Sequence, residues 1–100
     1  MDHPLYELVR RIPAGKVASY GSLGRALDNP ISGFMVGRMM ARGPEDLPWW
    51  RVVARDGRLP VDKKDPRLAD LQVQRLKSEG VEFAAEYQVA ASAFIDPDLL

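Results

Sequence analysis

The chain has 100 residues, of which 46% are apolar, and its 14 basic and 14 acidic side chains give a formal net charge of zero. This length allows one domain, and no apolar run approaches the ~20 residues that cross a bilayer. The chain has no cysteine and one histidine, His3, which excludes disulfides, thiolate nucleophiles, catalytic triads and multi-histidine metal sites. We therefore expect a binding protein without metal or cofactor. Because its start lacks the basic region of a secretory signal, we expect a cytoplasmic location and no membrane partner.

The first expected element is an amphipathic helix over residues 4–12. Apolar residues recur there at the i, i+3, i+4 and i+7 positions of one helix face, namely Leu5, Leu8, Val9 and Ile12. Pro4 suits the first turn, and the Pro-Ala-Gly-Lys stretch at 13–16 ends the helix. His3 precedes it at the terminus, where disorder is the default expectation.

Two short helices joined by a turn follow, as in a helix-turn-helix unit over about 19–42. Ser19 is placed to cap a helix over about 20–27. A polar turn containing proline comes next, and then either Ser32 or Asn29 caps a helix that runs to about residue 42. This outline is common among proteins and is weak evidence of function by itself.

The last helix of this unit has two different faces at 100° per residue. An apolar stripe, expected to face the core, consists of Val36, Met39 and Met40. Phe34 and Arg38 point the other way, and Gly33 and Gly37 add positions without a side chain. Such a face suits close approach to another surface and contact with phosphates. The alternative, that Phe34 packs beneath the neighbouring loop, stays open.

Residues 44–64 are predicted to form a loop and a hairpin. The β-branched pair at 52–53 precedes an Asp-Gly turn at 56–57, which leads to Leu59 and Val61. This is the most basic stretch of the chain, with Arg51, Arg55, Arg58, Lys63 and Lys64. Residues 1–64 hold eleven basic and seven acidic side chains, a balance of +4. A basic region of this kind can bind a polyanion, although an ordinary solvated surface explains the charge equally well.

The remaining residues are predicted to form one helix, one short strand and a tail. Asp65 caps and Pro66 starts a helix that Gly80 ends, and its apolar side is expected to hold Leu68, Leu71 and Leu76. The alternation at 81–83 is typical of a strand. Residues 84–100 have no clear pattern and are expected to form a loose tail. The acidic balance of residues 65–100, three basic against seven acidic side chains, is either a docking face for a protein partner or plain surface.

Three stretches resemble the DNA-binding domain of the O6-alkylguanine-DNA alkyltransferases: 17–21 (Val-Ala-Ser-Tyr-Gly) on to Asn29-Pro30, Val36-Gly37, and 48–53 (Pro-Trp-Trp-Arg-Val-Val). In that family a Pro-Cys-His-Arg-Val pentad holds the acceptor cysteine. Trp49 stands at the cysteine position, as in the alkyltransferase-like proteins. The match continues through 77–82 and spans roughly residues 5–83. It implies a mainly α winged helix-turn-helix-like domain with a small β-hairpin, as in the alkyltransferase C-terminal domain.

The resemblance implies a single DNA-binding domain over 1–100 that acts without catalysis. Such a protein binds duplex DNA carrying O6-alkylguanine through the minor groove, flips the base into a pocket, and flags it for nucleotide excision repair proteins. We expect a monomer. The alternatives are a sequence-specific helix-turn-helix transcription regulator, and an enzyme using Lys16 or a carboxylate; few base-reading side chains support the first, and no residue pair supports the second.

Site residues follow from the same resemblance. Tyr20 matches the tyrosine that presses on the phosphate 3′ of the flipped nucleotide, and it belongs with Trp49, Trp50 and Arg51 to the expected lesion pocket. Glu79 matches a glutamate that, in the true transferases, belongs to the relay that activates the acceptor cysteine. Because both the cysteine and the histidine of that relay are absent here, Glu79 is expected to be structural. The expected DNA-binding residues are Tyr20, Ser32, Gly33, Phe34, Gly37, Arg38 and Arg58.

Two positions depart from the family's pattern. Trp50 replaces a histidine that most alkyltransferase-like proteins keep. Phe34 aligns with the family's arginine finger, which replaces the flipped base in the stack. Our hypothesis is that Phe34 acts as an apolar wedge and that the change costs selectivity for the opposite base.

Overall fold

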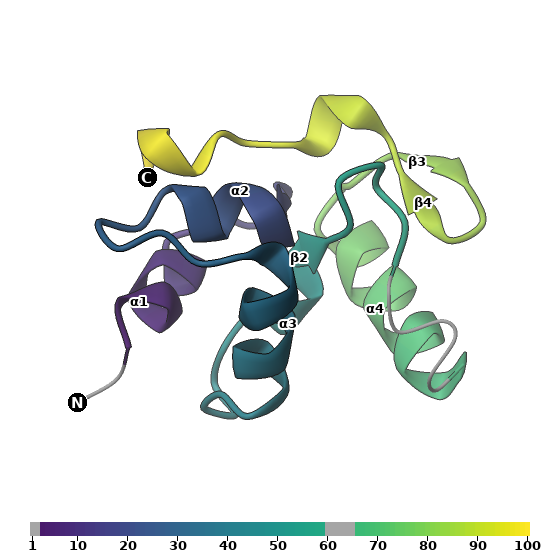
Figure 1. Ribbon diagram of the computed structural model, residues 1–100. Helices are drawn as coiled ribbons and strands as arrows, with labels where there is room; N and C mark the ends of the chain where they lie inside the picture. The colour runs from purple at the N-terminus through teal and green to yellow at the C-terminus, as the bar shows by residue number, and fades with distance from the viewer. Residues whose placement is uncertain (1–2, 60–65) are drawn as a thin grey trace.

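The computed structural model describes residues 3–59 and 66–100 of the chain. Two groups of elements lie side by side, with helices α1 to α3 in one and helix α4 with a strand pair in the other (Figure 1). Each group has its own apolar cluster. The first consists of Leu5, Val9, Ile12, Ala18, Leu23, Val36, Leu47 and Val52. The second consists of Val17, Val53, Leu59, Leu76, Val81, Val89 and Ala93.

Helix α1 (Pro4–Arg10) begins at an ordered cap. The Nδ1 atom of His3 accepts a hydrogen bond from the Leu5 amide at 3.1 Å, so the expectation of a disordered His3 is wrong. The cap satisfies one of the free amides of the first turn, which fixes the residue in place. The helix ends two residues earlier than expected, yet Ile12 stays buried beyond it.

Helices α2 (Tyr20–Arg25) and α3 (Gly33–Ala41) form the expected helix-turn-helix pair. The hydroxyl of Ser19 accepts from the Ser22 amide at 3.1 Å, and that of Ser32 accepts from the Met35 amide at 3.1 Å. Ser32 rather than Asn29 is therefore the cap of α3. The chain packs closely around Gly24, where a Cβ atom would overlap the carbonyl of Ile31 in the turn before α3 and lie 3.3 Å from a methyl group of Val36 in α3.

Strand β1 (Ala18–Ser19) pairs in parallel with strand β2 (Val52–Val53). The prediction that β2 pairs with the residues after the Asp-Gly turn is therefore wrong. The turn itself does form, with Gly57 at φ 89° and the Ala54 amide donating to the Arg58 carbonyl at 2.9 Å. The chain after the turn pairs elsewhere, because the Leu59 amide donates to the carbonyl of Tyr87 at 3.1 Å. The expected second arm at Val61 lies outside the described residues.

The strand pair separates the two apolar clusters. Successive side chains of a strand point to opposite faces, so Ala18 and Val52 enter the first cluster while Val17 and Val53 enter the second. In this buried position β2 pairs with β1, whereas the residues after its turn pair with the C-terminal segment, where Arg58 forms an antiparallel bridge to Gln88.

Helix α4 (Pro66–Ser78) starts at the expected proline, while the expected cap, Asp65, lies outside the described residues. Its buried positions are Ala69, Gln72 and Leu76. Leu68 is 42% exposed, so its predicted place on the apolar side of the helix is wrong. Because Ala69 and Gln72 are buried in place of Leu68 and Leu71, the inner face of α4 is shifted by one residue from the predicted leucine stripe.

The C-terminal segment is an ordered part of the fold, and the expected loose tail is wrong. Strands β3 (Phe83–Ala85) and β4 (Gln88–Val89) form an antiparallel pair, and the 3-10 turns η3 (Ala91–Ala93) and η4 (Pro97–Leu99) follow. The predicted strand begins two residues late because the Val81 amide closes α4 on the Leu76 carbonyl.

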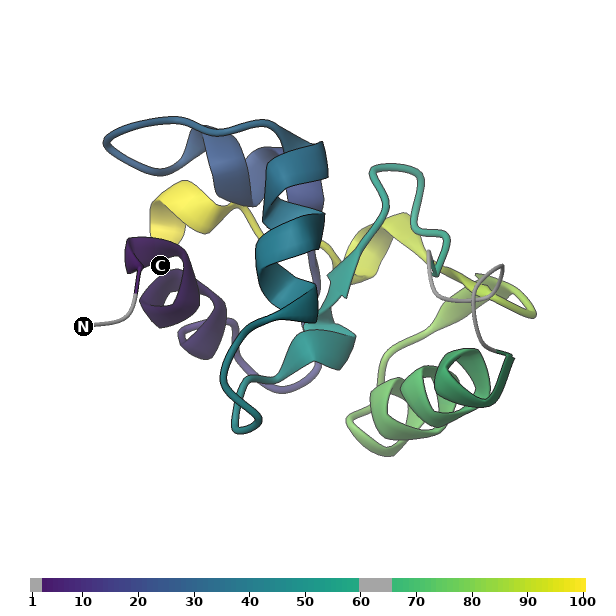
Figure 2. The ribbon, with the colours of Figure 1, turned by 60° about the horizontal axis from the view of Figure 1, so that its bottom comes forward.

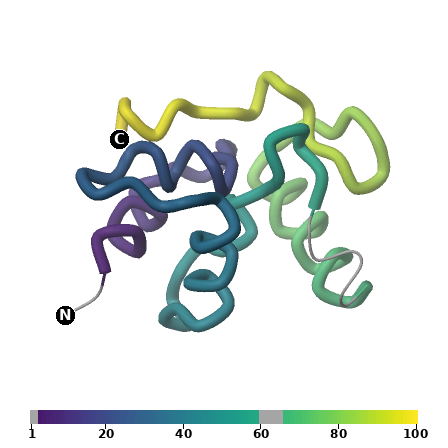
Figure 3. Tube along the Cα trace, in the orientation of Figure 1, coloured from purple at the N-terminus to yellow at the C-terminus, as the bar shows by residue number. Residues whose placement is uncertain are grey.

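This segment returns across both groups of elements to end beside the first (Figure 3). The Val17 amide donates to the Ala93 carbonyl and the Ile95 amide to the Val17 carbonyl, both at 2.9 Å. These bonds add the segment to the free side of β1. Among the described residues, no helix combines the length and apolar character needed to span a membrane.

Candidate nucleic-acid interface

A cavity of about 720 Å³ lies where α3, α4 and the loop before β2 meet. Figure 2 shows α3 and α4 on either side of this junction. The residues that line the cavity are predominantly apolar: Tyr20, Gly33, Phe34, Gly37, Arg38, Met40, Ala41, Trp49, Ala54 and Leu68. Its volume lies within the ~300–1,000 Å³ of small-molecule pockets, so it has room for a nucleobase with a substituent.

Trp49 opens the 3-10 turn η1 (Trp49–Arg51), which leads directly into β2. Its ring meets that of Trp50 edge to face, with centroids 6.1 Å apart and planes at 85°. The two indoles therefore point in different directions, and only Trp49 is among the cavity's lining residues. An indole offers a flat stacking surface and one N–H donor, which suits a flipped base.

Tyr20, the first residue of α2, forms part of the cavity beside α3. Burial raises the pKa of its phenol to about 12, because the ionised form would lose its hydration. The phenol therefore stays protonated at neutral pH and can donate to a phosphate oxygen. Its ring lies 3.8 Å from the position that a Cβ atom on Gly37 would take, so the helices meet closely here.

Phe34 and Arg38 stand at the cavity on the first and second turns of α3. Phe34 is 75% exposed, which rules out packing beneath the neighbouring loop. The guanidinium carbon of Arg38 lies 6.0 Å from the centre of the phenyl ring. The predicted core stripe is confirmed at Val36, which is fully buried, while Met39 and Met40 pack against the same cluster.

Trp50 and Arg51 are not among the residues that line the cavity; both hold the carboxylate of Glu79. The Trp50 Nε1–H donates to Glu79 Oε2 at 3.1 Å, and the Arg51 Nη2 lies 2.6 Å from the same oxygen. Arg75 completes this cluster from α4, with its guanidinium carbon 4.6 Å from the centre of the Trp50 ring. The Trp50 indole thus occupies a hydrogen-bonded place behind the loop that presents Trp49.

Glu79 ties three segments of the chain together. Its carboxylate also accepts from the Gly15 amide at 3.3 Å, and Arg51 Nη1 donates onward to the Ile12 carbonyl at 2.8 Å. Burial alone would raise the pKa of Glu79, but the hydrogen bonds from Arg51, Trp50 and Gly15 outweigh it and lower the pKa. Glu79 is therefore charged at neutral pH, and it joins the segment after α1 to the turn η1 that presents Trp49.

Gln72 is a supporting residue that sequence reasoning missed. Its side-chain amide is buried and donates to the carbonyls of Trp50 at 3.1 Å and Val52 at 3.3 Å. These bonds fix the backbone on both sides of Arg51. The available signal was a glutamine three residues after Ala69 and four before Leu76, at the spacing of one helix face.

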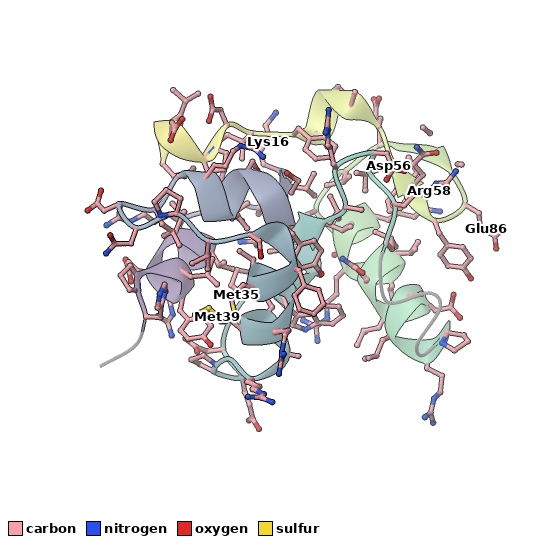
Figure 4. The ribbon with its side chains drawn as sticks, viewed as in Figure 1. Lys16, Met35, Met39, Asp56, Arg58 and Glu86 are labelled. Atoms are coloured by element: carbon pink, nitrogen blue, oxygen red, sulfur yellow. The ribbon has the colours of Figure 1, made fainter. Side chains whose placement is uncertain are left out.

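Ser32 and Arg58 lie outside the cavity lining. Ser32 caps α3 next to the cavity residues Gly33 and Phe34. Arg58 is 74% exposed and lies 3.5 Å from the carboxylate of Asp56. Figure 4 shows these two side chains together beside β4, away from α3.

A helix-turn-helix pair with an apolar cavity beside its second helix defines a small nucleic-acid-binding domain of mainly helical class. The family described as "6-O-methylguanine DNA methyltransferase, DNA binding domain" matches residues 1–81. The chain belongs to this family.

Individual relatives agree with this assignment. The chain is 31% identical over 88 residues to a DNA base-flipping protein of Vibrio parahaemolyticus, covering 86% of this chain and 85% of that protein. It is 37% identical over 81 residues to alkyltransferase-like protein 1 of Schizosaccharomyces pombe, covering 78% and 73%. The solved structure of S. pombe Atl1 with damaged DNA containing O6-carboxymethylguanine matches with a TM-score of 0.79 at 26% identity, covering 95% of this chain and 98% of Atl1. The alkyltransferase-like fold is therefore confirmed.

Proposed function

We propose that this protein recognises O6-alkylated guanine in duplex DNA by binding through the minor groove and flipping the base into the cavity between α3 and α4. The observation that carries the proposal is the cavity itself, with Trp49 in it and the helix-turn-helix beside it. The relatives named for base flipping, and the Atl1 complex with an O6-alkylated guanine, support it.

Trp49 provides the stacking surface for the flipped base. An apolar cavity of about 720 Å³ accepts an alkylated base more readily than a bare one, because each buried CH₂ contributes about 0.8 kcal/mol. Extruding a base costs a few kcal/mol, and the cost is least for a damaged pair. Selectivity then comes from weaker pairing together with apolar contact in the cavity.

Tyr20 and Arg38 hold the phosphates near the flipped nucleotide. Phosphate contacts fix the register of a protein on DNA without reading its sequence. The protonated phenol of Tyr20 supplies a donor beside Trp49, and Arg38 supplies a charge at the cavity. Arg58 is proposed to contact the backbone at the other end of the interface, beside β4.

The proposed role is recognition without alkyl transfer. The sequence contains no cysteine, and the indole of Trp49 is not a nucleophile that could accept an alkyl group. We propose that the bound lesion is handed to nucleotide excision repair proteins, and that the protein acts as a monomeric single domain in the cytoplasm. The exposed face of α3 offers chiefly Phe34 and Arg38, which argues against reading a sequence in the major groove.

Fluorescence anisotropy with two duplexes that differ only in one O6-methylguanine tests the proposal at fixed moderate salt. The parent protein is expected to bind the modified duplex at least tenfold more tightly. Trp49→Ala is expected to lose most of that preference while it keeps the affinity for unmodified DNA. Leu99→Ala, an exposed change at the far end of the chain, is the control. A uniform loss on both duplexes would instead make Trp49 a core residue.

A further inference from the structure

The side chain of Phe34 protrudes from α3 at the edge of the cavity. It is 75% exposed at the first turn of α3 and lies beside the same cavity as Trp49 and Tyr20. A large exposed aromatic ring contributes little to folding stability, because most of its apolar surface stays in water. Its place at the cavity suggests a surface that is covered only in a complex.

The residues around Phe34 leave its ring protruding. Gly33 before it packs so closely on α2 that an added Cβ would lie 3.1 Å from the Gly21 amide nitrogen. Gly37, one turn beyond Gly33, also has no side chain and lies against the Tyr20 ring. The phenyl ring therefore projects from a part of α3 where the flanking turn positions Gly33 and Gly37 add no side chains beside the cavity.

We propose that Phe34 inserts into the base stack in place of the flipped nucleotide and that the protein consequently does not read the base opposite the lesion. This inference rests on the proposed function. Inserted Phe, Leu and Met side chains separate base steps in other minor-groove proteins. A phenyl ring stacks on any base but carries no hydrogen-bond donor or acceptor, so it treats cytosine and thymine alike.

Arg38 is the nearby group that could read the opposite base instead. Its guanidinium carbon is 6.0 Å from the Phe34 ring, one turn further along α3. We expect this charge to contact the DNA backbone around the insertion point, where it adds affinity without sequence information. The substrate class is therefore alkylated guanine in either a correct pair or a mispair.

Anisotropy titrations on duplexes with O6-methylguanine opposite cytosine, thymine or adenine, and on unmodified DNA, test this inference. The parent is expected to bind the three modified duplexes within about threefold of one another. Phe34→Ala is expected to weaken all three about tenfold, as loss of one stacking contact implies. Phe34→Arg, which adds donors, is expected to create a preference for cytosine. Met35→Ala is the control, since Met35 is 44% exposed on the same helix but does not line the cavity (labelled in Figure 4).

The outcomes separate this inference from the proposed function. If the parent prefers modified DNA but Phe34→Ala binds as tightly as the parent, the wedge is overturned and lesion recognition stands. If the parent itself discriminates more than tenfold among opposite bases, indifference to the partner base is overturned. Equal binding of modified and unmodified DNA by the parent overturns both proposals. Circular dichroism of each variant shows whether the fold is intact.

Discussion

Two adjacent tryptophans have different surroundings at the scale of single residues. Trp49 lines the cavity, whereas Trp50 donates its N–H to Glu79 and has the guanidinium carbons of Arg51 and Arg75 within 5.5 Å and 4.6 Å of its ring centre. Trp50 stands where the resemblance places a histidine, and it keeps a hydrogen bond to the glutamate. The cluster around Glu79 therefore holds the loop that presents Trp49.

Glu79→Gln is expected to destabilise the protein by about 3 kcal/mol at pH 7, because it leaves the half-buried Arg51 without its counter-charge. The pKa of Glu79 is lowered by folding, so its contribution is present at neutral pH and is lost as the pH falls below its ordinary 4.5. Urea unfolding between pH 7 and pH 3 measures this effect, and the variant is expected to show a weaker acid dependence.

Asp46→Asn is the matched control for that experiment. Asp46 also pairs with an arginine, Arg10, and its pKa is also lowered by that hydrogen bond, but the pair is exposed. Exposed pairs contribute little to stability. A loss from Asp46→Asn as large as that from Glu79→Gln would contradict the role given to burial.

At the scale of elements, the contact between α2 and α3 sets the geometry of the cavity, because Tyr20 and Phe34 are held on opposite members of this pair. Gly24 of α2 faces the carbonyl of Ile31, in the turn that leads to α3, without space for a methyl group. The turn of the helix-turn-helix is therefore held by backbone contact, including the hydrogen bond from the Ile31 amide to the Gly24 carbonyl at 3.2 Å, as well as by the caps.

Gly24→Ala is expected to destabilise the protein by about 1–3 kcal/mol through overpacking, despite the better helix propensity of alanine. Gly21→Ala in the same helix is the control, since its Cβ would meet only the flexible end of Arg25 at 3.3 Å. Thermal unfolding measures the effect, and we expect a lower melting temperature for Gly24→Ala than for Gly21→Ala. Equal melting temperatures for them would contradict the close approach.

At the scale of the whole molecule, the sequence predicts local elements better than their partners. The caps at Ser19 and Ser32 and the start of α4 at Pro66 follow from signals within a few residues, and the structure confirms them. The partner of β2 and the docking of the C-terminal segment depend on contacts between distant parts of the chain, such as Ile95 with Val17, which no local pattern encodes.

The candidate site likewise contains residues that the sequence predicts and one that depends on how a helix packs. Tyr20, Phe34, Arg38 and Trp49 were selected from the sequence, and the structure places them around one cavity. Leu68 also lines the cavity, although the leucine spacing predicts a place on the core side of its helix; the buried positions of α4 are Ala69, Gln72 and Leu76 instead. Side-chain direction on a helix depends on what the helix packs against, which the leucine spacing alone does not give.

Binding to DNA is expected to weaken as salt rises, because phosphates neutralised by arginine release their counterions. Arg38→Ala is expected to weaken modified and unmodified duplexes by the same factor and to reduce the slope of log affinity against log salt by about one. The same titration applied to Arg58→Ala tests its contact beside β4. A change in lesion preference for Arg38→Ala would contradict a backbone role for this residue.

In the proposed function the alkylated base leaves the DNA helix and stacks on Trp49. The chain has two tryptophans, so Trp50→Phe leaves Trp49 as the sole reporter and Trp49→Phe leaves Trp50. Tryptophan emission during titration with the modified duplex is the most direct measurement. We expect strong quenching of Trp49 emission and little quenching of Trp50 emission by the modified duplex, and weaker quenching of both by unmodified DNA. Unchanged Trp49 emission at saturating modified DNA, with binding shown by anisotropy, would contradict this stacking.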